Sequence, residues 1–288
     1  MSAKRAAQTS LSGRVLLAED NPVNQAVAMD MLESLGCQVT MAATGQEALA
    51  ALSQAAYNVV LMDCQMPELD GLEATRMIRA QEAQAGHTHL PIIALTANAF
   101  SKDREACLAA GMDDYLSKPF TLDQLHATLA RWLPPQIGTP LSPTALNNDS
   151  PQASRTPAIY AGQTQAHPLR RTSPLDPKPL DALRALQQTG GSDVLGKVLR
   201  TYLQSAPPLL TALREAVAGS DAAAVRQAAH SLKSSSAQIG ALALSAHCKE
   251  LEALGRANTL TNAPTVLAYL EEEYPVVEAA LTAELDAL

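Results

Sequence analysis

The first 133 residues alternate short apolar runs with stretches of helical periodicity, and this alternation allows few architectures. Five runs are rich in strand-forming residues, at 14–18, 38–42, 58–62, 91–95 and 114–117. Helical patterns follow them at 22–35, 45–54, 71–80, 100–110 and 121–132. Five such units in sequence predict a doubly wound α/β domain with a mostly parallel sheet. The runs VLLA and VVLM are apolar throughout, as expected of strands covered on both faces.

A proline-rich window separates this block from the rest of the chain. Ten of the 18 prolines fall between Pro134 and Pro179, among Ser, Thr, Gln and Asn. This composition favours a flexible or polyproline-II linker, which would span roughly 35–40 Å if flexible. We therefore expect an N-terminal tail at 1–12, a first domain at 13–133, a linker at 134–179 and a second domain at 180–288.

The second domain shows no convincing strand pattern. Its Ala- and Leu-rich stretches are interrupted at Gly190-Gly191, Pro207-Pro208, Gly219-Ser220, Gly240 and Asn258. Helices joined by short connections at such breaks predict an antiparallel helical bundle.

Composition excludes several classes of function. The net charge is -8, and both predicted domains carry more acidic than basic residues, which argues against nucleic-acid binding. No apolar run reaches the roughly 20 residues that cross a bilayer, and the N-terminus does not resemble a signal peptide. The four cysteines are far apart and form no CxxC pair, which favours a reducing compartment. We expect a cytoplasmic protein.

Polar residues recur where the predicted strands end. Glu19 and Asp20 follow the first strand, Asp63 the third, Thr96 the fourth and Lys118 the fifth. The carboxyl ends of parallel strands share one edge of the sheet, so these side chains should converge. Each residue alone would be a helix cap or a turn residue, but their coincidence at four of five strands is improbable.

The residue types at this edge point to phosphoryl chemistry. Three nearby carboxylates repel one another, and a hard cation such as Mg²⁺ removes that conflict. Asp63 could then attack a phosphorus atom and form an acyl phosphate. Lys118 and the Thr96 hydroxyl would hold the remaining phosphoryl oxygens.

Residues 13–133 resemble a response-regulator receiver domain. The motifs that carry the resemblance are LLAEDN, VLMDCQMPELDG, ALTA and YLSKPF, which together cover nearly the whole block. The resemblance implies a (βα)5 fold with strand order 2-1-3-4-5. It also implies Asp63 as the phosphoacceptor and Asp20 and Asp63 as Mg²⁺ ligands, with Glu19 in the same acidic pocket.

The same resemblance assigns roles to residues around the pocket. The backbone carbonyl of Gln65 would be a further Mg²⁺ ligand, and Lys118 would bind the phosphoryl group. Thr96 would move toward that group, and Tyr115 would rotate inward as a readout. The bond between Lys118 and Pro119 is commonly cis in the family.

One histidine stands out in the second domain. The stretch from Asp221 to Ile239 reads as a helix that begins at an Asp N-cap and is ended by Gly240. His230 lies roughly 160° from the centre of the apolar stripe, so we expect it to face solvent. Lys233 places a cation one turn away, and Ser234 is a small neighbour that allows close approach. A neutral imidazole there could take a phosphoryl group.

The stretch AHSLKSSSAQIGA, followed by CKELEALGRAN, resembles the phosphohistidine region of histidine phosphotransfer (HPt) domains. The resemblance covers about 178–288 and implies a four-helix bundle with His230 as the phosphorylated residue. The family usually has Gly where this chain has Ser234. Serine is small, so we expect docking to survive, and whether transfer is slightly slower or partner choice altered stays open.

Together these features predict a two-component phosphorelay protein. A histidine kinase would phosphorylate Asp63, the group would pass to His230, and a separate response regulator would receive it. The chain would thus be a phosphotransfer intermediate without a kinase ATP-binding segment. Three alternatives stay open: the C-terminal part of a hybrid sensor histidine kinase, an interaction module without onward transfer, and a Mg²⁺-dependent phosphohydrolase. Gln65 disfavours the last, because it occupies the position where an acid–base carboxylate would be needed.

Overall fold

The computed structural model describes residues 11–86, 88–96, 101–133, 173–190 and 193–288. The first part is a parallel sheet in the order β2-β1-β3-β4-β5, which confirms the predicted topology. Its strands are β1 (Arg14–Ala18), β2 (Gln38–Ala42), β3 (Val59–Asp63), β4 (Ile92–Thr96) and β5 (Asp114–Ser117). The helices between and after them are α1 (Pro22–Ser34), α2 (Gly45–Gln54), α3 (Gly71–Ala85), α4 (Ser101–Ala110) and α5 (Leu122–Leu129).

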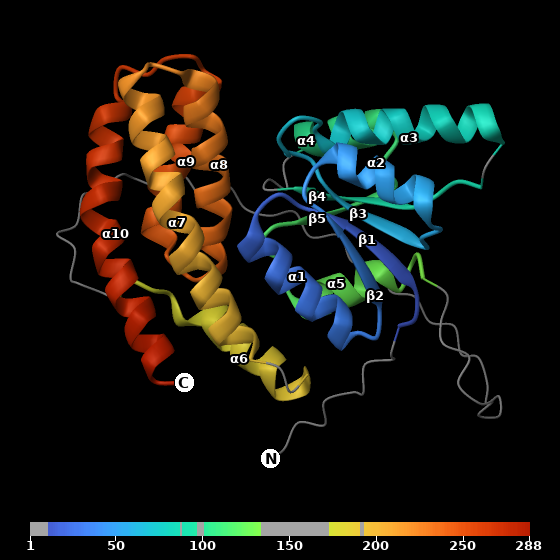
Figure 1. Cartoon of the computed structure of the whole chain (residues 1–288), viewed down its shortest axis with the longest axis horizontal. Helices are drawn as coiled ribbons and strands as arrows, with labels where there is room; N and C mark the ends of the chain where they lie inside the picture. The colour runs from blue at the N-terminus through green and yellow to red at the C-terminus, as the bar shows by residue number, and fades with distance from the viewer. Residues whose placement is uncertain (1–10, 87, 97–100, 134–172, 191–192) are drawn as a thin grey trace, which may run out of the picture.

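The helices cover both faces of this sheet, with α1 and α5 on one side and α2, α3 and α4 on the other (Figure 1). Successive strand residues therefore belong to different cores. Leu17 and Leu61 pack toward α1 and α5, whereas Leu16 and Met62 pack with residues of α2 and α3. This two-sided burial explains why the sequence runs show no polar alternation.

Strands β3 and β4 each begin and end one residue later than the sequence suggested. Asp63 and Thr96 are consequently the last residues of their strands. The helix predicted at 71–80 continues to Ala85 and ends at Gly86, whose φ of 64° suits glycine. At its start, Gly71 lies against the carbonyl of Asp63, where a Cβ atom would come within 1.9 Å of the oxygen. Glycine therefore allows α3 to begin directly over the end of β3.

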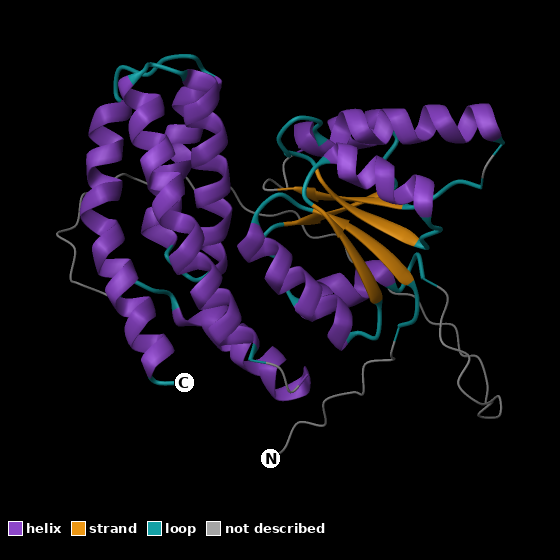
Figure 2. Cartoon of the chain, viewed as in Figure 1, coloured by secondary structure: helices purple, strands orange, loops and turns teal. Residues whose placement is uncertain are grey.

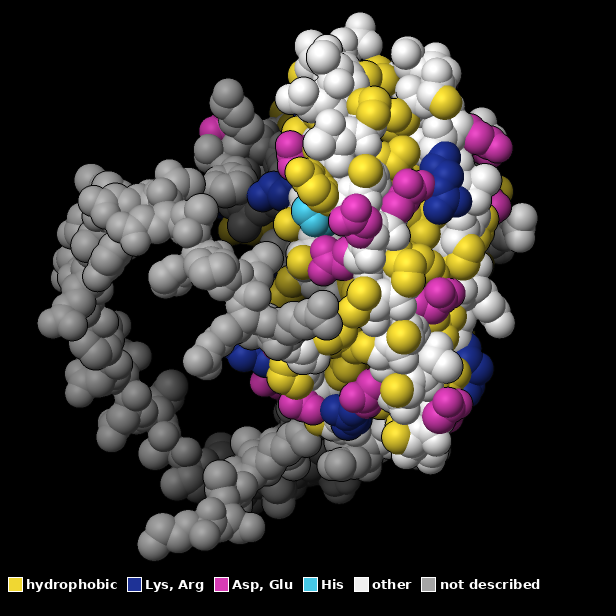
Figure 3. All heavy atoms as spheres, turned by 90° about the vertical axis from the view of Figure 1, so that its left-hand side faces the viewer, with side chains coloured by type: hydrophobic (Ala, Val, Ile, Leu, Met, Phe, Trp, Pro, Cys, Tyr) yellow, Lys and Arg dark blue, Asp and Glu magenta, His cyan; other side chains and the backbone are white. Residues whose placement is uncertain are grey.

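The second part is helical, as predicted, and consists of α6 (Pro177–Gly190), α7 (Val194–Ala218), α8 (Ala222–Gln238), α9 (Leu242–Arg256) and α10 (Ala263–Asp286). Helices α7 to α10 form the bundle (Figure 2), and α6 packs against α7 and α1. The outer side of the bundle mixes apolar, acidic and basic side chains (Figure 3). Within the described residues, no helix is long and apolar enough to cross a membrane, and the cytoplasmic location stays a prediction.

The predicted break at Pro207-Pro208 is wrong, because α7 runs through both prolines. A proline inside a helix costs about 3 kcal/mol. The helix nevertheless keeps Tyr202, Ala206 and Leu210 on one buried stripe across this point. Each large apolar side chain contributes roughly 1.5–3 kcal/mol when buried, so packing on both sides outweighs the local penalty.

The two parts of the chain pack against each other through α1, which contacts α6, α7 and α8. One continuous apolar cluster extends from the α1 side of the sheet into the bundle. Most of the predicted linker lies outside the described residues, and the predicted domain boundaries stay predictions. The sheet's carboxyl edge thereby comes to lie against the bundle.

Candidate functional site

Three carboxylates meet at the carboxyl edge of the sheet, as the sequence predicted. Glu19 and Asp20 follow β1, and Asp63 ends β3. One oxygen atom from each lies within 4.8 Å of the others. Glu19 and Asp63 are buried, and Asp20 is half-buried. Such a set of hard oxygen donors fits a divalent cation like Mg²⁺.

Lys118 follows β5 and inserts its ammonium group between two of these carboxylates. Its Nζ atom lies 2.5 Å from Glu19 Oε2 and 2.5 Å from Asp63 Oδ2. Burial alone would lower the pKa of Lys118, but Asp63 and Glu19 outweigh it and raise that pKa above its ordinary value. The lysine is therefore a fixed positive charge beside Asp63. The peptide bond from Lys118 to Pro119 is cis.

The other two carboxyl groups, those of Glu19 and Asp20, have pKa values well above the ordinary ones. Burial is the main cause that raises the pKa of Glu19 to about 7, with Asp63 adding to it and Lys118 opposing it. Burial, again followed by the charge of Asp63, raises the pKa of Asp20 to about 6. The edge thus concentrates more negative charge than Lys118 neutralises, which is the electrostatic signature of a cation site.

The other predicted residues of this edge occupy different positions. Thr96, the last residue of β4, is buried and lines the same cavity as Asp63 and Gln65. The backbone N–H of Gln65 donates to Asp63 Oδ1 over 3.1 Å. Tyr115 lies away from the cavity lining: its side chain is exposed, and the Arg104 guanidinium lies 5.3 Å from its ring centroid.

His230 lies on α8, and side chains from two helices hold it. The Asp221 side chain caps the start of α8 by accepting from the N–H groups of Ala223 and Ala224, as predicted for an Asp N-cap. His230 Nδ1 lies 3.0 Å from Glu252 Oε1 and 3.5 Å from Lys233 Nζ. Lys233 also pairs with the other Glu252 oxygen. A proton on Nδ1 that is donated to Glu252 leaves the Nε2 lone pair for a reaction.

The expectation that His230 faces solvent is wrong. Its side chain is only 12% exposed, although it points away from the buried stripe of α8 formed by residues such as Val225 and Leu232. The periodicity assigned the correct face of the helix. It could not show that Glu252 and the edge of the sheet cover that face.

The acidic edge and the imidazole share one cavity of about 440 Å³ between the sheet and the bundle. Its lining includes Asp20, Asp63 and Thr96 from the first part, and His230 and Glu252 from the second. His230 is close enough to Asp20 to lower the pKa of that carboxyl, against the larger effect of burial. The structure therefore brings together two predicted sites that 167 sequence positions separate.

Sequence reasoning missed three residues that shape this arrangement. Glu252 is 4% exposed and positions the imidazole from α9. Asn21 donates from Nδ2 to the carbonyl of Ser231 over 2.8 Å, and Asn24 bridges Glu19 and Ser234. Glu252 stands between Leu251 and Ala253 in the helical run CKELEALG, which was a signal for its burial, whereas nothing in the sequence indicated the partners of the two asparagines.

Comparisons with known proteins agree with this geometry. Residues 15–130 match the family model of the response regulator receiver domain, and 197–288 match that of the Hpt domain. The sensor protein GacS of Pseudomonas syringae pv. syringae is 33% identical over 252 residues, which cover 87% of this chain and 25% of GacS. The sensor histidine kinase RcsC of Salmonella typhi is 45% identical over 116 residues, or 40% of this chain and 12% of RcsC.

A solved structure is similar to the first domain. It is the receiver domain of the sensor histidine kinase PA1611 from Pseudomonas aeruginosa PAO1, with a magnesium ion coordinated in its active site cleft. It is 53% identical, covers 42% of this chain and 97% of its own, and has a TM-score of 0.39. The chain spans about a quarter of the length of GacS. It carries a response regulator receiver domain followed by an Hpt domain, the order found in hybrid histidine kinases, and this pair of domains supports a phosphorelay function.

Proposed function

We propose that Asp63 accepts a phosphoryl group and passes it to His230 of the same molecule. The observation that supports this proposal is the shared cavity, which Asp63 and His230 both line. Holding donor and acceptor in one enclosed site replaces a bimolecular encounter with a unimolecular step. The docked arrangement also raises the effective concentration of one domain at the other.

Around Asp63, the chain supplies the charges that the reaction needs. We infer that Glu19, Asp20, Asp63 and the Gln65 carbonyl hold Mg²⁺, which when bound would neutralise phosphoryl oxygens. Lys118 pairs with the Asp63 carboxylate and would shift to the phosphoryl group once that carboxylate is phosphorylated. Thr96 is positioned in the cavity wall to donate its hydroxyl to a phosphoryl oxygen. In this proposal Tyr115 rotates inward as the readout.

His230 receives the phosphoryl group in a single displacement at phosphorus. The Nε2 lone pair attacks phosphorus, the N–P bond forms, and the P–O bond to Asp63 breaks, which returns the carboxylate. Positive charge develops on the imidazole ring. Glu252, whose carboxylate lies 3.0 Å from Nδ1, stabilises that charge, and Lys233 holds the Glu252 carboxylate in place by pairing with its other oxygen.

We infer that a histidine kinase supplies the phosphoryl group and that a response regulator receives it from His230. Because the chain's own receiver domain covers His230, the external regulator must bind after the two domains separate. GacS and RcsC are sensor kinases, so a second proposal is that these residues are the receiver–Hpt portion of a hybrid sensor histidine kinase.

The test is to label the chain with a radioactive phosphodonor in the presence of Mg²⁺ and follow the label over time. Acyl phosphate is labile to base and phosphohistidine is labile to acid, so the two species are separable. D63N should abolish labelling, and H230Q should keep the label on Asp63. H247Q should behave as wild type, because His247 lies on α9 and pairs with Glu273 at 3.4 Å, outside the shared cavity.

Protein concentration separates transfer within a molecule from transfer between molecules. The rate should stay constant over a hundredfold dilution of the wild-type chain. A mixture of H230Q and D63N chains should react only at a concentration-dependent rate. Label that never reaches His230 would support the alternative of an interaction module without onward transfer.

A further inference from the structure

Two asparagines at the start of α1 make polar contacts with α8. The Asn21 side chain caps α1 through Oδ1, which accepts from the N–H groups of Val23 and Asn24, and its Nδ2 atom reaches the Ser231 carbonyl. One turn along, Asn24 Nδ2 lies 3.2 Å from Ser234 Oγ. These contacts fall on the turn of α8 that directly follows His230. They therefore fix where the imidazole sits over the sheet edge.

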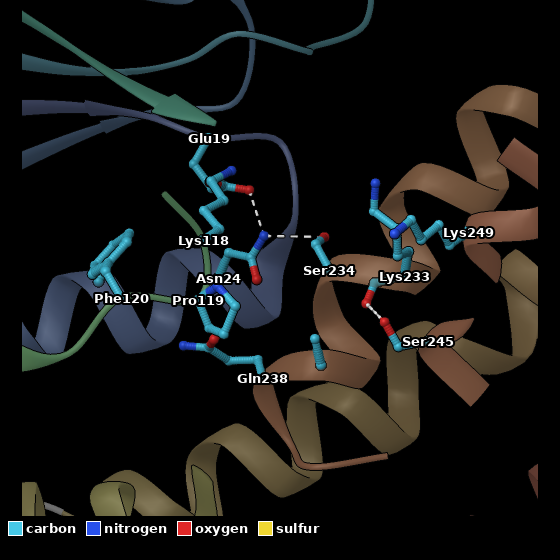
Figure 4. A pocket seen from close by; sticks show the side chains of 12 residues that line it. Glu19, Asn24, Lys118, Pro119, Phe120, Lys233, Ser234, Gln238, Ser245 and Lys249 are labelled. Atoms are coloured by element: carbon cyan, nitrogen blue, oxygen red, sulfur yellow. Dashed lines mark hydrogen bonds and ion pairs between the residues drawn. The ribbon is translucent and has the colours of Figure 1, made fainter. Parts of the chain in front are cut away.

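The Asn24 amide has both of its N–H groups engaged. One donates to Glu19 Oε1 over 2.9 Å and the other to Ser234 Oγ. Glu19 in turn accepts from Lys118, which also donates to Asp63, so a continuous chain of polar contacts runs from the Asp63 site to α8. Figure 4 shows its last part, from Glu19 through Asn24 to Ser234. Ser234 donates its own proton to the Ser231 carbonyl, which leaves its lone pairs for the Asn24 amide.

We propose that Ser234 is a specificity residue, whose hydroxyl selects a receiver domain that presents an amide donor at the position of Asn24, as the chain's own receiver does. This inference rests on the proposed transfer from Asp63 to His230. A receiver with an apolar side chain at that position leaves the Ser234 lone pairs facing a half-buried surface without a donor. Unpaired polar groups at an interface discriminate more strongly than an added contact does.

The chain's own receiver is the occupant that the structure favours. Asn24 and Ser234 both line a second cavity, of about 190 Å³, between the domains, together with Lys118, Phe120 and Gln238. The apolar cluster that joins α1 to the bundle is continuous with this contact. The amide and hydroxyl thus meet inside an interface whose hydrophobic part is already formed.

The test is a double-mutant cycle in the full chain. N24L removes the amide with little change of shape, and S234A removes the hydroxyl without weakening α8, because Ala is a better helix former than Ser. The measured quantity is the rate at which label moves from Asp63 to His230, normalised to the label first present on Asp63. The preference is the transfer rate of the Asn24 chain divided by that of the N24L chain. This ratio should be about three- to tenfold larger in chains that keep Ser234 than in chains that carry S234A. The contact of Asn24 with Glu19 is lost equally in both backgrounds and cancels.

S245A is the matched control. Ser245 lines the same cavity from α9, but its hydroxyl donates to the Lys233 carbonyl within the bundle. It should keep the full preference for Asn24. An equal preference for Asn24 in the Ser234 and S234A chains, with transfer still occurring, overturns this inference and leaves the proposed function standing.

A second readout does not depend on phosphoryl transfer. Hydrogen exchange of the first two turns of α1 should become faster in S234A and stay unchanged in S245A, because loss of the contact loosens docking. If the wild-type chain moves no label to His230, the proposed function fails, and hydrogen exchange alone then tests the contact between Asn24 and Ser234. Equal exchange rates in S234A and wild type would show that this contact does not hold the domains together.

Discussion

At the scale of single residues, Glu252 is the group whose behaviour most depends on its surroundings. Its carboxylate contacts three cationic or potentially cationic groups, from His230, Lys233 and Arg256. Burial alone would raise the pKa of Glu252, but the hydrogen bonds from His230 and Lys233 lower that pKa to about 2. A carboxylate that is paired with cations in the folded state, but not in the unfolded state, stabilises the fold only while it is ionised.

E252Q should therefore change the dependence of stability on pH. The folded pKa is below the ordinary value of 4.5, so the carboxylate's contribution is complete above about pH 5 and is lost as the pH falls toward 2. The free energy of unfolding of E252Q should be lower than that of wild type by roughly 2–3 kcal/mol at pH 6–7. The difference should close on acidification, as measured by chemical denaturation at a series of pH values.

The control for that measurement is E250Q, which makes the same chemical change at an exposed position of α9. It should show a difference from wild type of at most about 0.5 kcal/mol across this pH range, as is usual for surface substitutions. A wild-type advantage over E252Q that does not shrink at all between pH 6 and pH 2 would contradict the proposed ion pairing.

The sequence predicted the residues of the Asp63 site more completely than those around His230. Asp63, Thr96 and Lys118 were predictable because strand ends of a parallel sheet must meet at one edge. Glu252 was not, because its place beside His230 depends on how α9 packs against α8, and one helix's periodicity does not report on its neighbour. The position of Tyr115 outside the cavity likewise could not be deduced from its place in the motif.

At the scale of elements, α7 shows where local signals fail. Proline lacks the N–H donor and its ring crowds the preceding turn, so two adjacent prolines indicated a break. The helix continues because buried side chains on both sides of the two prolines form one stripe that packs on the bundle. A break at the prolines would divide this stripe. By contrast, the end of α8 was predictable, since Gly240 has a φ of 82° that few other residues adopt.

P208A should consequently stabilise the chain. Pro208 is exposed, so alanine removes the penalty for proline in a helix interior without disturbing the core. Part of this gain is offset by the greater freedom of the unfolded chain, and we expect a net increase of about 1–2 kcal/mol. Thermal unfolding followed by circular dichroism measures it.

P264A provides the comparison for that substitution. Pro264 is also exposed, but it lies in the first turn of α10, where a backbone N–H has no helical partner. The same exchange there should give no increase in the free energy of unfolding. If P208A likewise fails to stabilise the chain, the prediction is contradicted. Pro208 then does not impose the usual cost of a proline in a helix interior.

At the scale of the whole molecule, docking of the two domains is what sequence patterns could not predict. The proline-rich window suggested a tether that permits many arrangements, and the net acidity of both domains gave no reason for attraction. The structure supplies that reason in apolar packing of α1 against the bundle, with an ion pair at its edge. Lys197 of α7 lies 3.5 Å from Asp30 of α1. The other Asp30 oxygen, Oδ2, is buried without a hydrogen-bond partner.

A charge swap at this ion pair should control docking and transfer together. D30K places a second cation opposite Lys197 at a position where the side chain is only 7% exposed, and the repulsion between the two cations costs on the order of 1–4 kcal/mol. The domains should separate, which small-angle scattering would detect as a larger radius of gyration, and transfer to His230 should slow about tenfold or more. Adding K197D should restore both the radius of gyration and the transfer rate, because residues 30 and 197 then form an ion pair with reversed charges. R200D makes the same charge change on α7, where Arg200 pairs with Asp193, the N-cap of the same helix, and should leave both quantities as in wild type. Slow transfer with an unchanged radius, or no rescue by K197D, would show that α1 does not dock on α7 in the state that transfers.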